Sequence, residues 1–215
     1  MARLSGQGAE DLYIRLGIRR RGLARVKEQT AGIPGQLKVG VVGVKINVGM
    51  VQRMLLDHPY IDFYAYDTNL QLARYASSLF FHAGKTAATY SETNIQVLST
   101  LSALPGHLAI LISHTGENGR LIELARLLRR GNTRTIVITS GKDTTLGRMA
   151  DEFLYAPIAL GMDRMWSSTF FTAAKYLLDL MYAIVFCSDY NSNMALNQRY
   201  EAIGAATFWG LNSQE

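Results

Sequence analysis

One unbroken apolar run followed by a polar turn constrains the fold of this chain more than any other stretch. Residues 108–112 (LAILI) carry no polar side chain, and residues 113–116 (SHTG) follow directly. An apolar run of this length, bounded by turn residues, is typical of a central parallel strand that is covered on both faces. Residues 117–130 then place leucines and alanine at helical spacing. We therefore expect a strand, a turn and a helix in succession.

The turn lies where a helix begins, and such a position favours an anion. The first N–H groups of a helix have no partner within it, and the helix dipole is positive at this end. Ser113 and Thr115 offer hydroxyl groups, and Gly116 permits a close approach of the backbone to a phosphate. The N–H groups of Gly116, Glu117 and Asn118 add donors, and the Glu117 side chain is expected to face outward. The alternative is that residues 115–118 only cap the helix.

Further short apolar runs alternate with helical patterns between residues 50 and 205. We expect strands at residues 61–66, 86–90, 108–113, 134–140 and 153–157. We expect helices at residues 50–58, 68–82, 92–101, 117–130, 146–150, 167–187 and 191–203. Alternation at this spacing implies right-handed crossovers between parallel strands. The predicted fold is therefore α/β, with three α/β/α layers in which helices cover both faces of a five-stranded parallel sheet.

The turn at residues 113–116, with the helix and strand that follow it, resembles part of SIS (sugar isomerase) domains. Ser113, Thr115 and Gly116 match the S-x-[ST]-G-x-[ST] loop of that family, and Asn118 stands where serine or threonine is usual. The order of elements from about residue 61 to residue 200 is also similar to the effector domain of RpiR-type (MurR/RpiR) bacterial transcriptional regulators. The resemblance implies the SIS fold, with a flavodoxin-like strand order of 2-1-3-4-5. It also implies a phosphorylated sugar or amino sugar as the ligand.

That strand order brings a second loop to the predicted site, because the ends of the first and third strands flank the topological switch point. In SIS domains the loop after the first strand resembles G-x-G-x-S, and here residues 65–69 (AYDTN) replace both glycines and the serine. Asp67 adds a negative charge and Asn69 an amide, although Asp67 as an ordinary helix N-cap is the alternative. Thr139 and Ser140, at the end of the fourth strand, complete the predicted ligand site.

A sugar-phosphate isomerase would also need a base, usually Glu or His, to move a proton between adjacent carbons. SIS isomerases generally supply that base from the fifth strand and the helices after it. Between residues 153 and 200 the acids are Asp163, Asp179 and Asp189, and no histidine occurs there. His114 is a candidate base, but we expect it to be a solvent-facing residue of the ligand loop. We therefore favour binding over catalysis, and assign no catalytic residue, no metal site and no cofactor.

The positive net charge of +5 lies in the N-terminal part of the chain. Residues 1–38 hold eight basic and three acidic side chains, and the remaining residues are balanced. Residues 16–27 (LGIRRRGLARVK) resemble the end of the helix-turn-helix domain of RpiR-type regulators. Contact with DNA phosphates is one interpretation of this arm, and a solvated interdomain arm is the other.

The first helices of a complete helix-turn-helix unit do not fit into the residues before this point. We therefore expect residues 1–30 to be a remnant of such a domain, or a chance likeness, that does not read base sequence. Accordingly, we divide the chain into a basic arm with a linker, residues 1–49, and an SIS domain, residues 50–205.

The lone cysteine, Cys187, excludes a disulfide within the chain, which fits a reducing cytoplasm. Cys187 ends the apolar run 170–187, and we expect it to be buried as a small hydrophobic residue. That run carries Lys175 and Asp179 and is too short to span a bilayer comfortably, so we expect a buried helix and no membrane. The same helix is a candidate dimer face in a homodimer or tetramer. No secretory signal follows Met1, which also predicts a cytoplasmic protein.

Three hypotheses of function follow. The preferred one is a domain that senses a phosphorylated sugar for a transcriptional regulator of carbohydrate metabolism. The second is a sugar-phosphate isomerase with His114 as its base. The third is a dimerisation module whose altered first loop no longer admits a ligand.

Overall fold

The computed structural model of the chain describes residues 46–102, 105–158 and 166–204. The predicted basic arm and most of the predicted linker lie outside the described residues. The strands are β1 (Tyr60–Ala65), β2 (Thr86–Thr89), β3 (His107–Ile112), β4 (Arg134–Thr139) and β5 (Glu152–Tyr155). The helices are α3 (Val48–Asp57), α4 (Asn69–Phe81), α5 (Thr93–Ser102), α6 (Gly119–Arg130), α7 (Thr145–Met149), α8 (Trp166–Ser188) and α9 (Tyr190–Gly204). Every strand and helix predicted above is present, with its ends within two residues of the prediction.

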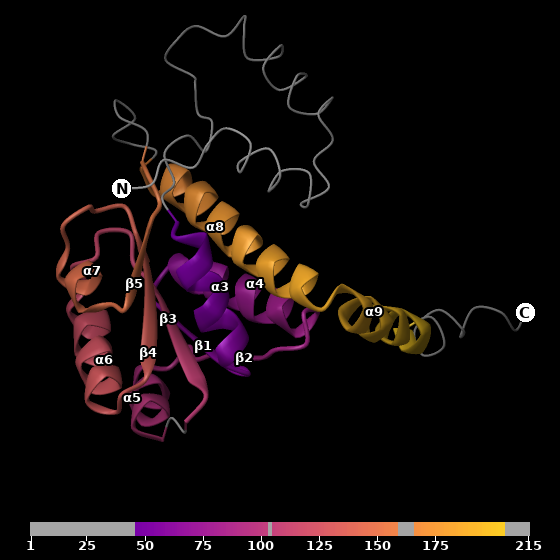
Figure 1. The fold of residues 1–215 in the computed structure, drawn as a ribbon. Coiled ribbons are helices and arrows are strands. Elements are labelled where there is room, and N and C mark those ends of the chain that lie inside the picture. The colour runs from indigo at the N-terminus through magenta and orange to yellow at the C-terminus, as the bar shows by residue number, and fades with distance from the viewer. Residues whose placement is uncertain (1–45, 103–104, 159–165, 205–215) are drawn as a thin grey trace, which may run out of the picture. The chain divides into compact units, whose positions relative to one another are not determined.

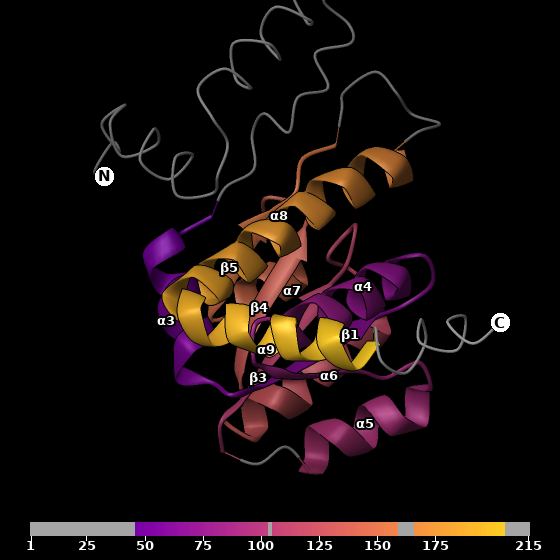
Figure 2. The ribbon, with the colours of Figure 1, turned by 90° about the vertical axis from the view of Figure 1, so that its right-hand side faces the viewer.

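The five strands form one parallel sheet in the order β2-β1-β3-β4-β5, which confirms the predicted topology. Figures 1 and 2 show α3, α4 and α8 on one face of this sheet and α5, α6 and α7 on the other. The three-layer prediction is thereby confirmed. Between β1 and β3 the register runs from Tyr60 opposite His107 to Ala65 opposite Ile112. The two strands end side by side, so the loops that follow them leave the same edge of the sheet.

Alternating side chains of the two central strands build two separate hydrophobic cores. Phe63 and Ile110 belong to the core under α3, α4 and α8, whereas Tyr64 and Leu111 belong to the core under α6. All four side chains are fully buried. Burial of one such side chain stabilises a fold by about 1.5–3 kcal/mol, and these strands are covered on both faces. The loops at their carboxyl ends therefore start from firmly held positions.

Helix α8 is apolar on nearly every side, but one face alone is buried. The residues of that face are Phe170, Ala173, Ala174, Leu177, Leu178, Met181 and Val185. Within the described residues, Thr169–Ser188 is the one stretch whose length and composition would suit a membrane span, and 39% of it is buried. A single such helix is weak evidence for a membrane, because a core helix meets the same criterion. Cys187 lies outside the buried face and is exposed, so the prediction of a buried cysteine is wrong.

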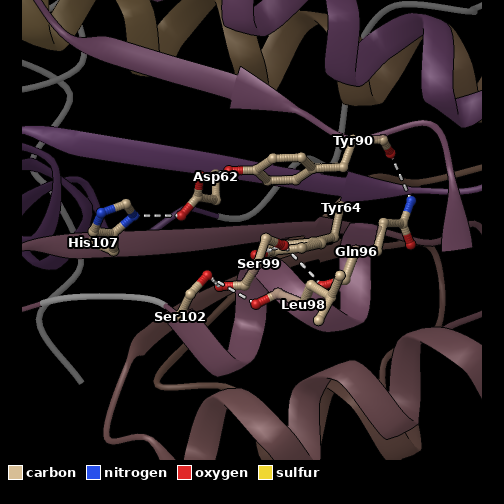
Figure 3. Close-up of polar contacts among 8 residues, drawn as sticks. All are labelled: Asp62, Tyr64, Tyr90, Gln96, Leu98, Ser99, Ser102 and His107. Atoms are coloured by element: carbon tan, nitrogen blue, oxygen red, sulfur yellow. Dashed lines mark hydrogen bonds and ion pairs between the residues drawn. The ribbon is translucent and has the colours of Figure 1, made fainter. Parts of the chain in front are cut away.

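A buried polar network lies between β1 and α5 (Figure 3). Asp62 is 4% exposed, and its carboxylate accepts a hydrogen bond from the Tyr90 hydroxyl at 2.9 Å and lies 2.6 Å from His107 Nδ1. Gln96 of α5 is fully buried and donates from Nε2 to the carbonyl oxygens of Ala65 at 3.3 Å and Tyr90 at 2.7 Å. Because Ala65 ends β1, Gln96 fixes the backbone where the first ligand loop begins.

Candidate functional site

The turn after β3 is closed by its own hydroxyl groups. The N–H of Gly116 donates to Ser113 Oγ at 3.1 Å, and the N–H of Glu117 donates to Thr115 Oγ1 at 3.2 Å. These two N–H groups are engaged within the turn, so they do not face a phosphate as the sequence analysis expected. Each hydroxyl oxygen is held from one side by an N–H group and keeps its own proton for a ligand. Ser113 and Thr115 therefore present two oriented donors at the carboxyl end of β3.

Asn118 caps α6, as one of the two interpretations of the sequence had it. Its side-chain oxygen accepts hydrogen bonds from the N–H groups of Arg120 at 3.1 Å and Leu121 at 3.2 Å. This satisfies two of the N–H groups that the start of a helix leaves without partners. The oxygen is thereby occupied, so the amide NH₂ is the group of Asn118 that can donate to a ligand.

The end of β4 holds the turn in place from the neighbouring strand. The hydroxyl groups of Thr139 and Ser140 both donate to the carbonyl oxygen of His114, at 3.0 Å and 2.7 Å. Both residues were predicted at the ligand, but their protons are used to hold the backbone of the turn. In this structure they position the ligand loop.

Thr144, which precedes α7, is a buried contact point between the loops after β3 and β4. Its Oγ1 accepts a hydrogen bond from the N–H of Gly147 at 3.0 Å and caps α7. A Cβ atom added at Gly116 would come within 2.5 Å of Thr144, and one added at Gly141 would also overlap it. Gly116 has a φ of +71°, so glycine is needed there for two reasons: the backbone is left-handed, and it lies close to Thr144. The loop motif of residues 113–118 predicts a glycine at position 116, but it gives no indication that Thr144 is the residue that this glycine contacts.

The Glu117 side chain, which was expected only to face outward, forms a hydrogen bond with the first residue of α7. Glu117 Oε1 accepts a hydrogen bond at 2.7 Å from the N–H of Thr145, the first residue of α7. This hydrogen bond lowers the pKa of the Glu117 carboxyl below its usual value of 4.5. The side chain is exposed, as expected, and it ties the ligand loop to α7.

The loop after β1 has a left-handed residue at a position where the SIS pattern has glycine. Asp67 has a φ of +52°, a conformation that glycine adopts freely and that aspartate tolerates better than most residues. The N-cap residue of α4 is Thr68, and no side chain caps this helix. The alternative that Asp67 is an ordinary N-cap is therefore wrong. Its carboxylate forms no hydrogen bond or ion pair with any residue that the structure describes.

A cavity lies between the two loops, at the switch point that the strand order predicts. Its volume is about 220 Å³. One ordered water needs roughly 10–15 Å³, so a small organic molecule can enter. The residues that line it are Tyr66, Asp67, Thr68, Asn69, Ile112, Ser113, His114, Thr115, Asn118, Leu121 and Phe170. Six of the nine predicted ligand residues are among them, and Gly116, Thr139 and Ser140 are not.

His114 turns inward, contrary to the prediction that it faces solvent. Its ring packs edge-on against Phe170 of α8, with 5.1 Å between the ring centroids, and both ring nitrogens are shielded from solvent. Burial lowers the pKa of the His114 imidazole below its usual value of 6.5, so the ring is neutral at pH 7. The contact joins two elements far apart in the chain, and no local pattern could show it.

Arg120 is a positive charge beside Tyr66, a residue that lines the cavity, and it was not among the predicted site residues. Its guanidinium lies 5.5 Å from the centre of the Tyr66 ring, and Nη1 donates to Thr93 Oγ1 at 3.4 Å. The position of Arg120 in the first turn of α6, next to the predicted ligand loop, could have identified it from the sequence. The direction of its side chain could not be predicted, because it depends on Tyr66 and Thr93 from other segments. No group of three or more His, Cys, Asp or Glu side chains in the described part of the chain could hold a metal ion.

Comparison with known proteins agrees with this geometry. A family model described as the SIS domain matches residues 54–176. The chain is 31% identical over 90 residues to the HTH-type transcriptional regulator HexR of Escherichia coli, an alignment that covers 42% of this chain and 31% of HexR. The chain spans less than half the length of the curated relatives that it matches.

Two solved structures show the same fold. NanR of Vibrio vulnificus, solved in complex with ManNAc-6P, matches with a TM-score of 0.67 and 16% identity, over 91% of this chain and 74% of NanR. The sugar isomerase domain of an RpiR transcription factor from Sphaerobacter thermophilus matches with a TM-score of 0.63 and 13% identity, over 72% of this chain and 85% of that domain. At these identities the likeness establishes the shared fold alone.

Proposed function

The chain belongs to the SIS domain family, and on that premise we propose that it binds a phosphorylated sugar as an effector. The observation that carries the proposal is the pair of oriented hydroxyl groups, Ser113 and Thr115, on one wall of the cavity. A phosphate group offers oxygen acceptors to such donors. Asn69 and Asn118 add amide groups that suit the hydroxyl groups of a sugar.

We further propose that the bound sugar phosphate controls a transcriptional regulator of carbohydrate metabolism. Two comparisons support this: HexR is an HTH-type transcriptional regulator, and NanR was solved in complex with ManNAc-6P. In this proposal the described domain is the part that senses the ligand, and a helix-turn-helix unit or the basic N-terminal arm contacts DNA. A cytoplasmic location belongs to the same proposal.

The test measures thermal unfolding and calorimetric binding of the full chain against hexose, pentose and amino-sugar phosphates. A ligand at a hundred times its dissociation constant stabilises the fold by about 2.7 kcal/mol, which shifts the melting temperature measurably. Thr115 is exposed, so Thr115→Val leaves the core intact and removes the hydroxyl together with the hydrogen bond that it accepts from the Glu117 N–H. Thr115→Ser is the matched control, because it keeps the hydroxyl and both of its roles. Loss of one hydrogen bond to a charged group, about 1.5–3 kcal/mol, predicts at least tenfold weaker binding for Thr115→Val alone. If no compound stabilises the chain, the proposal fails and the dimerisation hypothesis leads.

A second candidate function, an aldose–ketose isomerase, is favoured by one observation. His114 lines the cavity, and burial keeps its imidazole in the neutral form that can accept a proton. The assay is turnover of each sugar phosphate that binds. Turnover that is abolished in His114→Gln, with binding retained, would favour the enzyme, whereas binding without turnover in the parent chain excludes it for those compounds.

We also propose that the chain forms a homodimer through α8. Beside its buried face, this helix carries the partly exposed apolar residues Leu180 and Ala183. A helix that is apolar all round is normally covered on every side, and a second copy of α8 offers a matching apolar surface. Leu180→Glu is expected to give a monomer in sedimentation velocity. Leu98→Glu, at an exposed leucine of α5, is expected to leave the dimer intact.

A further inference from the structure

The carboxylate of Asp67 lines the ligand cavity without a role in the fold. It neither caps α4 nor forms an ion pair with any residue in the described ranges. Its backbone is left-handed, with a φ of +52°, so glycine or asparagine would suit the loop as well or better. The side chain is exposed, so within the described residues the carboxylate can face a ligand in the cavity without losing a contact of the fold.

This carboxylate stands in the same cavity as the donors proposed to receive a phosphate. Ser113 and Thr115 line the cavity from the end of β3, and Asp67 lines it from the end of β1. A phosphate bound at the two hydroxyl groups would be repelled by the Asp67 carboxylate, because the two like charges would share one cavity. A ligand that also carries a positive charge turns this repulsion into an attraction.

No cation of the described residues already neutralises Asp67. Arg120 lies over the ring of Tyr66, which lines the same cavity, and donates to Thr93; it makes no ion pair with Asp67. The site thus presents hydroxyl donors from one loop and an unpaired carboxylate from the other. An amine is the cationic group that sugars commonly carry, and it has donors for both carboxylate oxygens.

We propose that the ligand is an amino-sugar phosphate, whose ammonium group pairs with Asp67 while its phosphate lies at Ser113 and Thr115. This inference rests on the proposed function and deepens it, because it names the class of sugar. It also gives a reason why a ligand can bind although the first loop lacks the glycines of the SIS pattern: Asp67, in place of the second glycine, selects a sugar that carries a positive charge.

The test compares three compounds that differ in one group. Glucosamine 6-phosphate carries the amine, N-acetylglucosamine 6-phosphate carries a neutral amide in its place, and glucose 6-phosphate carries a hydroxyl group. The same series on the mannose scaffold covers the other orientation of this group. Dissociation constants are measured by calorimetry at pH 6.5 for the parent chain and for Asp67→Asn, which keeps the shape of the side chain and tolerates the left-handed backbone.

The parent chain is expected to bind the amine compound about tenfold tighter than its two neutral counterparts, as for a hydrogen bond to a charged group. Asp67→Asn is expected to weaken binding of the amine compound and to strengthen binding of the neutral ones. A folding defect cannot produce this crossover, because it would weaken all three. Equal affinity for the three compounds, or an unchanged preference in Asp67→Asn, overturns the inference and leaves the proposed function standing. Failure of every sugar phosphate to bind overturns both.

Discussion

Gly116 and Gly141 both lie against Thr144, and these contacts predict how far substitutions there change the free energy of unfolding. Gly141 has an ordinary backbone, but a Cβ atom added there would overlap the methyl group Cγ2 of Thr144, well inside the 3.0 Å that real Cβ contacts respect. Its next neighbour is the Thr115 carbonyl oxygen at 3.3 Å, which is tight but tolerable. Gly141→Ala is therefore expected to lower the free energy of unfolding by about 1–3 kcal/mol, the usual range for overpacking a buried site.

The single substitution Thr144→Ser deletes that methyl group and keeps the hydroxyl that caps α7. Alone, it is expected to cost about 0.5–1.5 kcal/mol, because a small buried gap remains. In the double variant with Gly141→Ala, the new methyl group occupies the vacated space. The double variant should therefore be more stable than Gly141→Ala alone, with a coupling energy of about 1–2 kcal/mol. Urea unfolding followed by circular dichroism gives all four values of the cycle.

Gly116 supplies the contrasting case. Its added Cβ would meet Thr144 Cβ and Oγ1, both at 2.5 Å, and serine keeps both atoms. The left-handed backbone adds about 1–2 kcal/mol of strain for alanine, so Gly116→Ala should cost about 2–5 kcal/mol without relief by Thr144→Ser. Gly119→Ala, with no atom within 4 Å of its Cβ, is the neutral control. Additive effects of Gly141→Ala and Thr144→Ser, within about 0.5 kcal/mol, would refute the packing described here.

The remaining predictions concern pH and buried hydrogen bonds. Burial lowers the pKa of His114 in the folded state, so its contribution to stability is present above the unfolded value of about 6.5 and declines as the pH falls below it. His114→Gln should flatten the stability curve below about pH 6.5. The hydrogen bond from the Thr145 N–H lowers the pKa of Glu117 in the folded state, so the ionised carboxylate stabilises the fold above about pH 4.5, and this stabilisation is lost as the pH falls through the folded-state pKa. Glu117→Gln should remove this loss of stability from an acid titration. Gln96→Leu removes two donated hydrogen bonds, including the one to Ala65, and should cost about 2–4 kcal/mol in urea unfolding.

The order of strands and helices along the chain could be predicted because each element depends on neighbouring residues, and the resemblance to SIS domains implied the order of the strands in the sheet. The apolar run 108–112 and the helical spacing after it are local patterns, and parallel strands with right-handed crossovers leave few arrangements. The meeting of the loops after β1 and β3 follows from strand order alone. For this reason Asp67 and Ser113, forty-six positions apart, could be assigned to one site before any coordinates.

The directions of the side chains at the site could not be predicted in the same way. His114 was expected in solvent, but Phe170 of α8 covers it. Thr139 and Ser140 have the right residue types for a ligand, and the structure shows their protons donated to a carbonyl oxygen. Each of these outcomes depends on an atom supplied by a distant segment.

By itself, the sequence determined the α/β class and the succession of strands, helices and loops, because periodicity and turn chemistry act over a few residues. The order of the strands in the sheet, which brings two of those loops to one cavity, was implied by the resemblance to SIS domains. The tertiary structure alone decided which groups in those loops are satisfied internally and which are left for a ligand. Gly116 and Glu117 have N–H groups that the turn uses itself, whereas the Asp67 carboxylate is left without a partner among the described residues. The physical reason is that a hydrogen bond is directional and short-ranged, so its partner is settled only when segments far apart in the chain are packed together.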